Sequence, residues 1–545
     1  MPARGVRVDT PAEQLTAGEA RRTRVPRWAW AAGLAVAAVV LFVCYVRLSR
    51  TIPDNSDGSD QALQAWDMLH GNWLLRGWTV GDVSYYTTEI PEYMIVEKFV
   101  GLGANVIHVA AGLTYMLLVL TAGWLAKGRA TGREGVVRAL VASGILLAPQ
   151  LGNGIHLLIQ QPDHIGTQVP LLLTFIVLDR GPRRWYIPAA VGVMLTWVIV
   201  SDRVAVFDAA APLVAVCVLR VLWARIHDGT RLVSQWFEVW LAAAGILSFG
   251  AAELVVAVIK HVGGYTSLPL PSKLTSLASL PLHLKLTVEG TLNLYGADFL
   301  GLSGWALVTA LVHLVGVALA LVGFFLAFRR LFSGDLILPV MATGIVFNVA
   351  FYVLSTVPAT WFDTREISVV LPFGAVLAGR QLAGPLARAR LEPVLAVVLA
   401  CYAAALGYGA VQPPVADSEQ PVVGWLEAHH LVTGLGTYTE SNIITLDSGG
   451  RVAIRTVTWL SSGAVPRAYE SEASWYDPRQ GYANFVVTNS ADGSGVSLIP
   501  RRDILALAGP PARTYHYKTF TIMVWNHNLL ANLGSPPSAR PGDVP

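Results

Sequence analysis

The chain has 545 residues, of which 54% are hydrophobic and 14% charged, and its formal net charge is +3. This composition is too apolar for an ordinary soluble protein, and no basic block with interleaved aromatic residues points to nucleic acid as a partner. The cysteines, Cys44, Cys217 and Cys401, each lie inside an apolar run, so we expect neither a disulfide framework nor a metal site from them.

Apolar runs of the length that crosses a bilayer as helix recur along residues 28–411. The basic segment 1–27 precedes the first run, which we interpret as an uncleaved anchor behind a cytoplasmic tail rather than a signal peptide. About eleven runs are predicted to span the membrane: 28–48, 103–126, 137–159, 164–178, 186–201, 204–223, 237–259, 302–328, 336–357, 366–382 and 392–411. The fourth and fifth are short, so one of them could be tilted, re-entrant or merged with a neighbour.

Basic residues gather in alternate connections between these runs. Clusters of Arg and Lys precede the first run and follow the second, fourth, sixth, eighth and tenth. Because positive loops stay in the cytoplasm, we expect a cytoplasmic N-terminus, and an odd number of spans then places the region beyond Val411 outside. The Ala-, Val-, Leu- and Arg-rich composition is typical of high-GC bacteria, so the predicted location is a bacterial cell membrane.

The first outer segment, residues 50–101, is acidic. Its apolar residues at spacings of three and four predict an amphipathic helix along the membrane surface, with Ser59 as N-cap. These residues are Ala62, Trp66, Leu69 and Trp73. Asp57 and Asp60 lie on the turn NSDGSD just before this helix, close to the end of the first span. Such a carboxylate could act as a general base or hold a divalent ion; the alternative is that both are simply solvated or cap the helix.

The next outer connection, between the third and fourth runs, contains Asp163 and His164 in the sequence QQPDH. Ionisable residues at this depth usually face a cavity or a partner. Asp163 and His164 are therefore candidates for a binding site. The alternative is a turn initiated by proline, with Asp163 capping the next helix.

Two arginines are candidates for holding a phosphate. Arg203 shares a tight outer turn with Asp202, where it could pair with that carboxylate or face a phosphate. Arg365 lies at the outer mouth of the tenth run, and a guanidinium fork matches phosphate geometry. The alternative for Arg365 is an ion pair with Asp363 or Glu366.

The remaining outer regions differ in kind. Residues 260–301 form a second outer segment that prolines interrupt. Alternating apolar residues at 451–459, 484–488 and 519–525 predict strands, so 412–533 is interpreted as a small extracytoplasmic α/β domain, followed by a disordered tail at 534–545. The aromatic residues of this domain are interpreted as its core and membrane contact, with sugar stacking as the alternative.

The stretch Asp57–Trp73, DGSDQALQAWDMLHGNW, resembles the opening loop of GT-C glycosyltransferases. These membrane enzymes take sugars from polyprenyl-phosphate carriers and include protein O-mannosyltransferases and lipid A aminoarabinose transferases. The pattern that ends the family's surface helix is matched by Met68, Leu69, Gly71 and Trp73. Counting back from it places Asp57 at the family's catalytic acidic position. Gly58 stands where the family often has Glu.

The resemblance implies an all-α polytopic membrane fold of GT-C type with an external C-terminal domain. It also implies an inverting transfer from a polyprenyl-phosphate-linked sugar to a hydroxyl acceptor of the cell envelope, with Asp57 or Asp60 as base. Arg365 or Arg203 would hold the donor phosphate, and Asp163 and His164 would help to shape its site. No cofactor is expected, and the spacing does not support a divalent metal. The rival hypotheses are a transporter or flippase of lipid-linked sugars and a non-catalytic cell-envelope scaffold.

Overall fold

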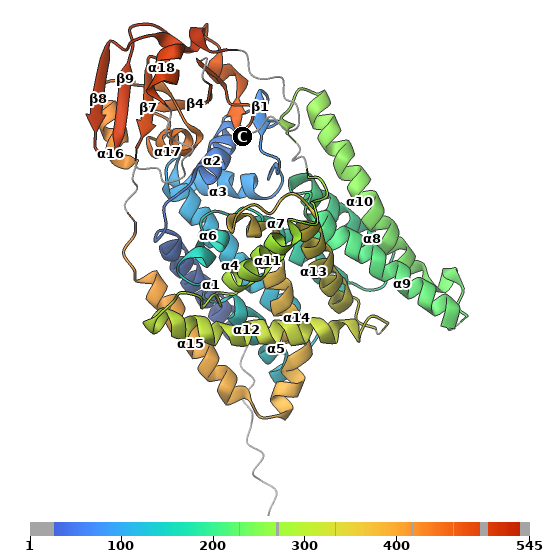
Figure 1. The fold of residues 1–545 in the computed structure, drawn as a ribbon. Coiled ribbons are helices and arrows are strands. Elements are labelled where there is room, and N and C mark those ends of the chain that lie inside the picture. Colours follow the sequence, from blue (N-terminus) through green and yellow to red (C-terminus); the bar gives the residue numbers. More distant parts are fainter. Residues whose placement is uncertain are drawn as a thin grey trace, which may run out of the picture. The chain divides into compact units, whose positions relative to one another are not determined.

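The computed structural model of the chain divides into two compact units, Met1–Leu41 and Phe42–Pro545. The described residues are 27–227, 229–268, 272–332, 334–415, 419–460, 463–490 and 500–534. The predicted cytoplasmic tail therefore lies outside the described residues except at Arg27, and the predicted disordered tail lies outside them beyond Gly534. Both sheets lie in the second unit (Figure 1).

Eight helices in the described part of the chain are long and apolar enough to cross a membrane, so the chain is a multi-pass membrane protein. They are built from α1 (Arg27–Ser49), α4 (Asn105–Lys127), α9 (Ala211–His227) with the π-helical turn η1 (Val206–Ala210), α10 (Trp236–His261) with η2 (Leu232–Gln235), α12 (Gly304–Phe328), α13 (Ile337–Leu354), α14 (Val370–Arg388) with η3 (Phe362–Ile367), and α15 (Glu392–Ala410). The two runs predicted to be short fold as α7 (Ile165–Arg180) and α8 (Tyr186–Ser201), with 16 residues each.

The predicted span 137–159 is wrong as a continuous helix. It is divided into α5 (Gly132–Leu146) and α6 (Asn153–Leu158). The break contains Pro149, which has no amide hydrogen to donate, and Gly152, whose φ of 107° is accessible mainly to glycine. The short helix α6 packs against η3 and α11 (Leu280–Leu294), so the connection that follows it lies close to η3.

The first outer segment contains α2 (Ser56–Leu69), β1 (Trp78–Val80) and α3 (Glu89–Val100). The predicted amphipathic helix is present as α2, but Ser59 is not its N-cap. The helix begins earlier, and the side chain of Asn55 accepts a hydrogen bond from the amide of Gly58 at 2.9 Å. The buried residues of α2 include Asp60, Gln61 and Gln64 as well as the expected Ala62, so the helix borders a polar interior.

A three-stranded sheet joins the three segments that were predicted to lie on one side of the membrane. The central strand β1 pairs in parallel with β2 (Thr266–Ser267) of the second outer segment, and antiparallel with β6 (Ser471–Glu472) of the C-terminal region. These segments therefore meet at one end of the helices. Which face of the membrane this end occupies stays a prediction.

The C-terminal region forms the predicted mixed α/β domain. Its six-stranded sheet has the order β5-β4-β3-β7-β9-β8, in which β3 is parallel to both β4 and β7. The strands are β3 (Thr433–Gly436), β4 (Ala453–Leu460), β5 (Gly463–Pro466), β7 (Phe485–Asn489), β8 (Arg513–Tyr517) and β9 (Phe520–Val524). The helices are α16 (Gln420–Ala428), α17 (Tyr438–Asp447) and α18 (Arg501–Ala508), with the short turns η4 (Ala473–Tyr476) and η5 (Leu529–Asn532).

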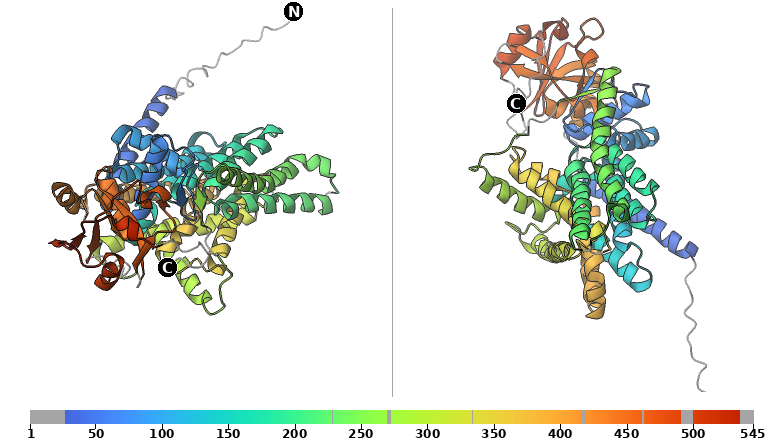
Figure 2. Two further views of the ribbon diagram at one scale, coloured as in Figure 1. Left: turned by 90° about the horizontal axis from the view of Figure 1, so that it is seen from above. Right: turned by 90° about the vertical axis from the view of Figure 1, so that its right-hand side faces the viewer.

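The C-terminal domain rests on the first outer segment. Helix α17 packs directly against α2, and Figure 2 shows the sheet, coloured orange to red, at the end of the helices where these outer segments gather. One face of the sheet buries Ile454, Phe485 and Ile522 in a single apolar cluster. This core fixes the position of α17, and through α17 the domain reaches α2.

Candidate functional site

Arg365 bridges two carboxylates that come from distant parts of the sequence. Its Nη1 donates to Oδ2 of Asp57 at 3.1 Å and to Oδ2 of Asp163 at 3.3 Å. The Arg365 and Asp57 side chains keep 26% and 27% of their surface exposed, whereas Asp163 keeps 6%. The predicted alternatives, an ion pair of Arg365 with Asp363 or Glu366 and a capping role for Asp163, are not what the geometry shows.

Local structure explains how these three side chains meet. Asp57 lies in the first turn of α2, where the Asn55 cap fixes the direction of the helix. Arg365 lies in η3, and its guanidinium carbon is 4.7 Å from the centre of the Phe362 ring, a cation–π contact. Asp163 also accepts hydrogen bonds from the amides of Gln61 and Gln161, so its buried carboxylate has several donors.

The C-terminal domain supplies a third contact to Asp57. The hydroxyl of Tyr438, at the start of α17, donates to Oδ1 of Asp57 at 2.5 Å, and Ser56 Oγ donates to the Tyr438 carbonyl at 2.5 Å. Burial alone would raise the pKa of Asp57, but Arg365 and the Tyr438 hydroxyl hold that pKa below its ordinary value. Asp57 is therefore ionised at neutral pH.

Asp60 is in a different state from Asp57. It is buried, its Oδ2 accepts from the amide of Gln64, and its Oδ1 has no hydrogen-bond partner among the described residues. Burial, together with the nearby charge of Glu470, raises the pKa of Asp60 well above its ordinary value. The two carboxyl groups one helical turn apart thus differ, because the pKa is lowered at Asp57 and raised at Asp60.

His164 lies between two further carboxylates. Its Nδ1 is 2.8 Å from Oδ2 of Asp202 and its Nε2 is 3.2 Å from Oε1 of Glu366. Burial would lower the pKa of His164, but Glu366 and Asp202 raise it well above its ordinary value, so both ring nitrogens carry protons. The φ of His164 is 56°, which non-glycine residues rarely adopt, and these two contacts hold the residue there.

These groups surround one acidic cavity of about 40 Å³. Its carboxyl groups belong to Asp57, Asp60, Asp82, Asp163, Glu366 and Glu470. Burial raises the pKa of Asp82 to about 6 and that of Glu470 to about 7. The volume has room for about three water molecules, so the site as it stands is closed to a sugar.

Arg203 does not belong to this cavity. Its Nη2 lies 3.0 Å from Oε1 of Glu253 on α10, and its side chain is half exposed. It does not pair with Asp202, which contacts His164 instead. Of the six residues selected from the sequence, the structure brings Asp57, Asp60, Asp163, His164 and Arg365 into one cavity and leaves Arg203 outside it.

Three further residues at the site, Tyr438, Arg467 and Glu470, were not predicted from the sequence. The guanidinium carbon of Arg467 lies 3.8 Å from the centre of the Tyr438 ring, and its Nη2 lies 3.4 Å from Oε2 of Glu470. No local motif marks these residues. Tyr438 reaches the site because α17 packs on α2, and Arg467 and Glu470 reach it because the adjoining strand β6 pairs with β1. Within the described part of the chain, no three His, Cys, Asp or Glu side chains are arranged to hold a metal ion.

Comparisons with known proteins concern the fold. No family model and no curated protein matches the sequence. The crystal structure of ArnT from Cupriavidus metallidurans in the apo state is similar over 93% of this chain and 99% of that one, with 14% identity and a TM-score of 0.50. ArnT bound to undecaprenyl phosphate gives 13% identity, 91% and 98% coverage and a TM-score of 0.49.

A third solved structure is the Archaeoglobus fulgidus oligosaccharyltransferase tethered with an acceptor peptide. It is 10% identical, with 85% of this chain and 69% of that one covered and a TM-score of 0.44. The similarity to apo ArnT extends over nearly the whole of both chains, so it concerns the helices and the C-terminal domain alike. The chain therefore has the GT-C type of fold that the motif at 57–73 led us to expect.

Proposed function

We propose that this chain is a membrane glycosyltransferase that moves a sugar from a polyprenyl-phosphate donor to a hydroxyl acceptor, with Asp57 as general base. The observation that carries the proposal is the contact between Asp57 and Arg365, 3.1 Å apart on the wall of one cavity. The two are an ionised carboxylate and a guanidinium. The first can take a proton and the second can hold a phosphate, which are the two tasks that this reaction needs. The fold shared with apo ArnT and the motif at 57–73 support the same proposal.

The reaction would be a single displacement. The acceptor oxygen attacks the anomeric carbon while its proton passes to a carboxylate oxygen of Asp57. The bond between the anomeric carbon and the phosphate oxygen breaks, and polyprenyl phosphate leaves with the electron pair, so the anomeric configuration inverts. Because a phosphate is a good leaving group, no second carboxylic acid is required to protonate it.

Donor binding would require Arg365 to exchange partners. In the closed site its Nη1 contacts Asp57 and Asp163, and the cavity is too small for a sugar. When the guanidinium turns to the donor phosphate, Asp57 loses the positive charge that lowers its pKa. The carboxylate then becomes a stronger base only when the donor is in place, which ties proton removal to a productive complex. Asp163 keeps the amide donors Gln61 and Gln161 during this exchange.

The rival transporter hypothesis predicts ionisable residues at mid-membrane depth, and Glu253 is a carboxylate within the predicted span 237–259. That side chain is 41% exposed and paired with Arg203, so it is not an isolated buried charge. Several ionisable side chains, by contrast, line the one cavity that Asp57 and Arg365 share.

The experiment uses membranes that contain the full chain, labelled polyprenyl-phosphate pentoses and hexoses, and total cell-envelope acceptor. We expect label to enter the acceptor with the wild type, and Asp57→Asn to lower the rate by about 10²–10⁴-fold. Asp477→Asn is the matched control, since Asp477 pairs with Arg479 outside the cavity. Equal rates for Asp57→Asn and the wild type would exclude Asp57 as base, and label that crosses the membrane without joining the acceptor would favour a transporter.

A further inference from the structure

A second polar pocket lies at the opposite end of the helices from the candidate site. Helix α14 follows η3, which carries Arg365, and ends at Arg388; the pocket is lined by the far end of α14 together with the ends of α5 and α12. Its volume is about 560 Å³. We call it the basic pocket, because its charged lining residues are Arg138, Arg329, Arg330, Arg380 and Arg388 with one carboxylate, Glu134.

The basic pocket has donors that no protein group satisfies. The Nε of Arg138 and the Nε2 of Gln381 are buried, and neither has a hydrogen-bond partner among the described residues. Glu134 accepts from Arg138 Nη2 at 2.6 Å, and Arg380 is paired with Asp179 and Asp335, which lie outside this lining, so Arg329 and Arg388 carry the exposed positive charge of the pocket. Buried donors without acceptors are costly, so the pocket is suited to an anion with several acceptor oxygens.

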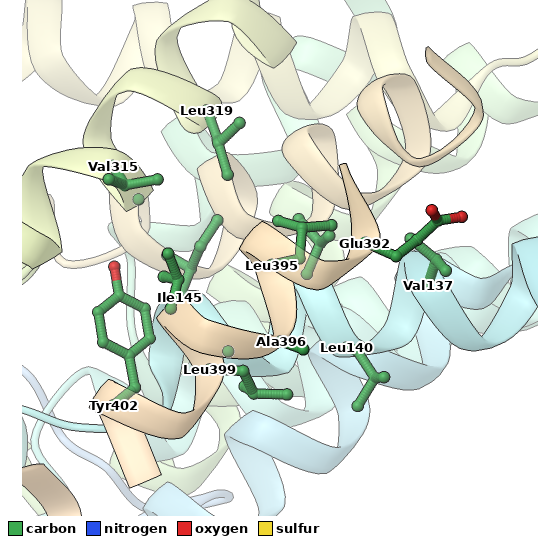
Figure 3. A pocket seen from close by; sticks show the side chains of 14 residues that line it. Val137, Leu140, Ile145, Val315, Leu319, Glu392, Leu395, Ala396, Leu399 and Tyr402 are labelled. Carbon is green, nitrogen blue, oxygen red and sulfur yellow. The ribbon is translucent and has the colours of Figure 1, made fainter. Parts of the chain in front are cut away.

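An apolar groove lies beside the basic pocket. It has a volume of about 270 Å³ and is formed by α5, α12 and α15. Figure 3 shows the side chains of Ile145, Val315, Leu395 and Leu399 around it, with the carboxylate of Glu392 at one edge and the ring of Tyr402 at the other. This lining fits a hydrocarbon chain, and apart from Glu392 and Tyr402 its side chains have no hydrogen-bonding groups for a polar ligand.

The groove and the basic pocket share two helices. Val137 of α5 lines the groove and the next residue, Arg138, lines the basic pocket, while α12 contributes Val315 to the first and Arg329 to the second. Along α15 the groove extends from Glu392 to Tyr402, about 15 Å at the rise of an α-helix. That is about half of the hydrocarbon thickness of a bilayer, or the depth of one leaflet.

We infer that the groove and the basic pocket together bind an anionic phospholipid of the leaflet on this side of the membrane. An acyl chain lies in the groove, and the phosphate accepts hydrogen bonds from Arg138, Arg329 and Arg388. The charge of the pocket selects the anionic headgroup, and the adjacent groove selects a lipid over a free anion. This inference is independent of the proposed transfer reaction, which concerns the other end of the helices.

The test measures lipid adducts of the purified full chain by native mass spectrometry. The probes are dioleoyl phosphatidylglycerol, dioleoyl phosphatidylcholine and inorganic phosphate. The headgroup variant is Arg329→Gln/Arg388→Gln, two exposed arginines, and its matched control is Arg225→Gln/Arg231→Gln, two exposed arginines outside the basic pocket. The groove variant is Gly316→Leu, since a Cβ there would lie 3.4 Å from Tyr402 Oη and 3.6 Å from Ile145, in ordinary contact.

We expect phosphatidylglycerol to bind at least about fivefold more than phosphatidylcholine, as expected for several arginines near one headgroup. The headgroup variant should lose this preference while the control keeps it, and Gly316→Leu should weaken the binding of both lipids. Equal binding of the two lipids, or a headgroup variant that behaves as the control does, would overturn the inference. Displacement of the lipid by inorganic phosphate, with Gly316→Leu unchanged, would instead show a free-anion site and overturn the assignment to a lipid.

Discussion

The hydroxyl of Tyr438 donates to Asp57 Oδ1 at 2.5 Å, although 381 positions separate the two residues in the chain. The contact makes the C-terminal domain a part of the candidate site rather than an appendage to the helices. Arg467, 3.8 Å from the centre of the Tyr438 ring, fixes the ring in turn. The domain therefore influences how readily the proposed base takes a proton.

The first prediction concerns Tyr438→Phe. The hydroxyl helps to hold the pKa of Asp57 below its ordinary value, so its removal raises that pKa. Transfer needs ionised Asp57, and the acidic limb of kcat/KM against pH should therefore move to higher pH, by about one unit for the loss of one hydrogen bond to a charged group. The exposed Tyr482 offers the control Tyr482→Phe. An unchanged pH profile with a lower rate would reduce Tyr438 to a structural role.

The second prediction concerns Arg365. Arg365→Gln leaves Asp57 and Asp163 facing each other without their shared cation, and it removes the proposed phosphate contact. We expect kcat/KM to fall by about 10²-fold or more, and Arg365→Lys to recover little of it, because an ammonium group cannot replace a planar fork that serves two acceptors. The measurement is the transfer rate over a range of donor concentrations. A lysine variant with wild-type kinetics would contradict the proposed phosphate role.

The third prediction separates the two carboxyl groups of α2. Asp60 is buried and its pKa is raised by burial and by the charge of Glu470, so an uncharged amide disturbs this position less than it disturbs Asp57. Asp60→Asn should retain a transfer rate within about tenfold of the wild type, whereas Asp57→Asn should lower the rate by about 10²–10⁴-fold. If Asp60→Asn abolishes transfer while the variant stays folded, then Asp60 is the base and the assignment must be reversed.

Much of the fold could be predicted from local sequence because the membrane imposes a length on apolar helices. The alternation in 484–488 likewise predicted β7 (Phe485–Asn489). The division of 137–159 could also have been predicted, since Pro149 and Gly152 mark the break. The length of an apolar helix, the alternation of a strand and a helix break each depend on residues that are close in the sequence, and for that reason they could be predicted.

Only some residues of the candidate site could be predicted from the sequence. Asp57, Asp163 and Arg365 were selected because each lies just beyond an apolar run, where the chain must surface. Tyr438 and Glu470 were not, because they reach the cavity through the packing of a separate domain, which no spacing encodes. Arg203 also lies just beyond an apolar run, as Arg365 does, and yet it pairs with Glu253 outside the cavity. The position of a residue at the end of a run therefore indicates its depth in the membrane, but it does not indicate which neighbouring helix the side chain contacts.

The fourth prediction concerns metal dependence. The family that the motif at 57–73 resembles often has Glu where this chain has Gly58. A Cβ at Gly58 would already lie 3.1 Å from Gln161 Oε1 and 3.2 Å from Asn55 Oδ1. The packing leaves little room for a second carboxylate beside Asp57. We therefore expect transfer to continue in excess EDTA, measured with the labelled donor. A rate that EDTA abolishes and that Mg²⁺ or Mn²⁺ restores would show that a divalent ion takes part.

The last prediction concerns the stability of the first outer segment. Glu89 is buried at the start of α3, where its Oε1 accepts hydrogen bonds from the Thr167 amide at 2.7 Å and the Thr167 hydroxyl at 2.8 Å. Burial raises the pKa of Glu89 to about 8. Between the ordinary value of about 4.3 and this raised value, the folded protein holds a proton that the unfolded chain has lost. Stability should therefore fall as the pH rises through this interval and change little from this group above it.

Glu89→Gln removes this titration, since the amide is neutral at every pH and can still accept from Thr167. We expect the thermal unfolding midpoint of the purified variant to match the wild type near pH 5 and to exceed it by a few degrees near pH 9. Glu97, whose pKa burial raises to about 9, keeps some pH dependence in both proteins. The exposed Glu134 provides the control Glu134→Gln. Parallel curves for Glu89→Gln and the wild type would mean that Glu89 is ionised in the folded protein, and that α3 and α7 are held together without its proton.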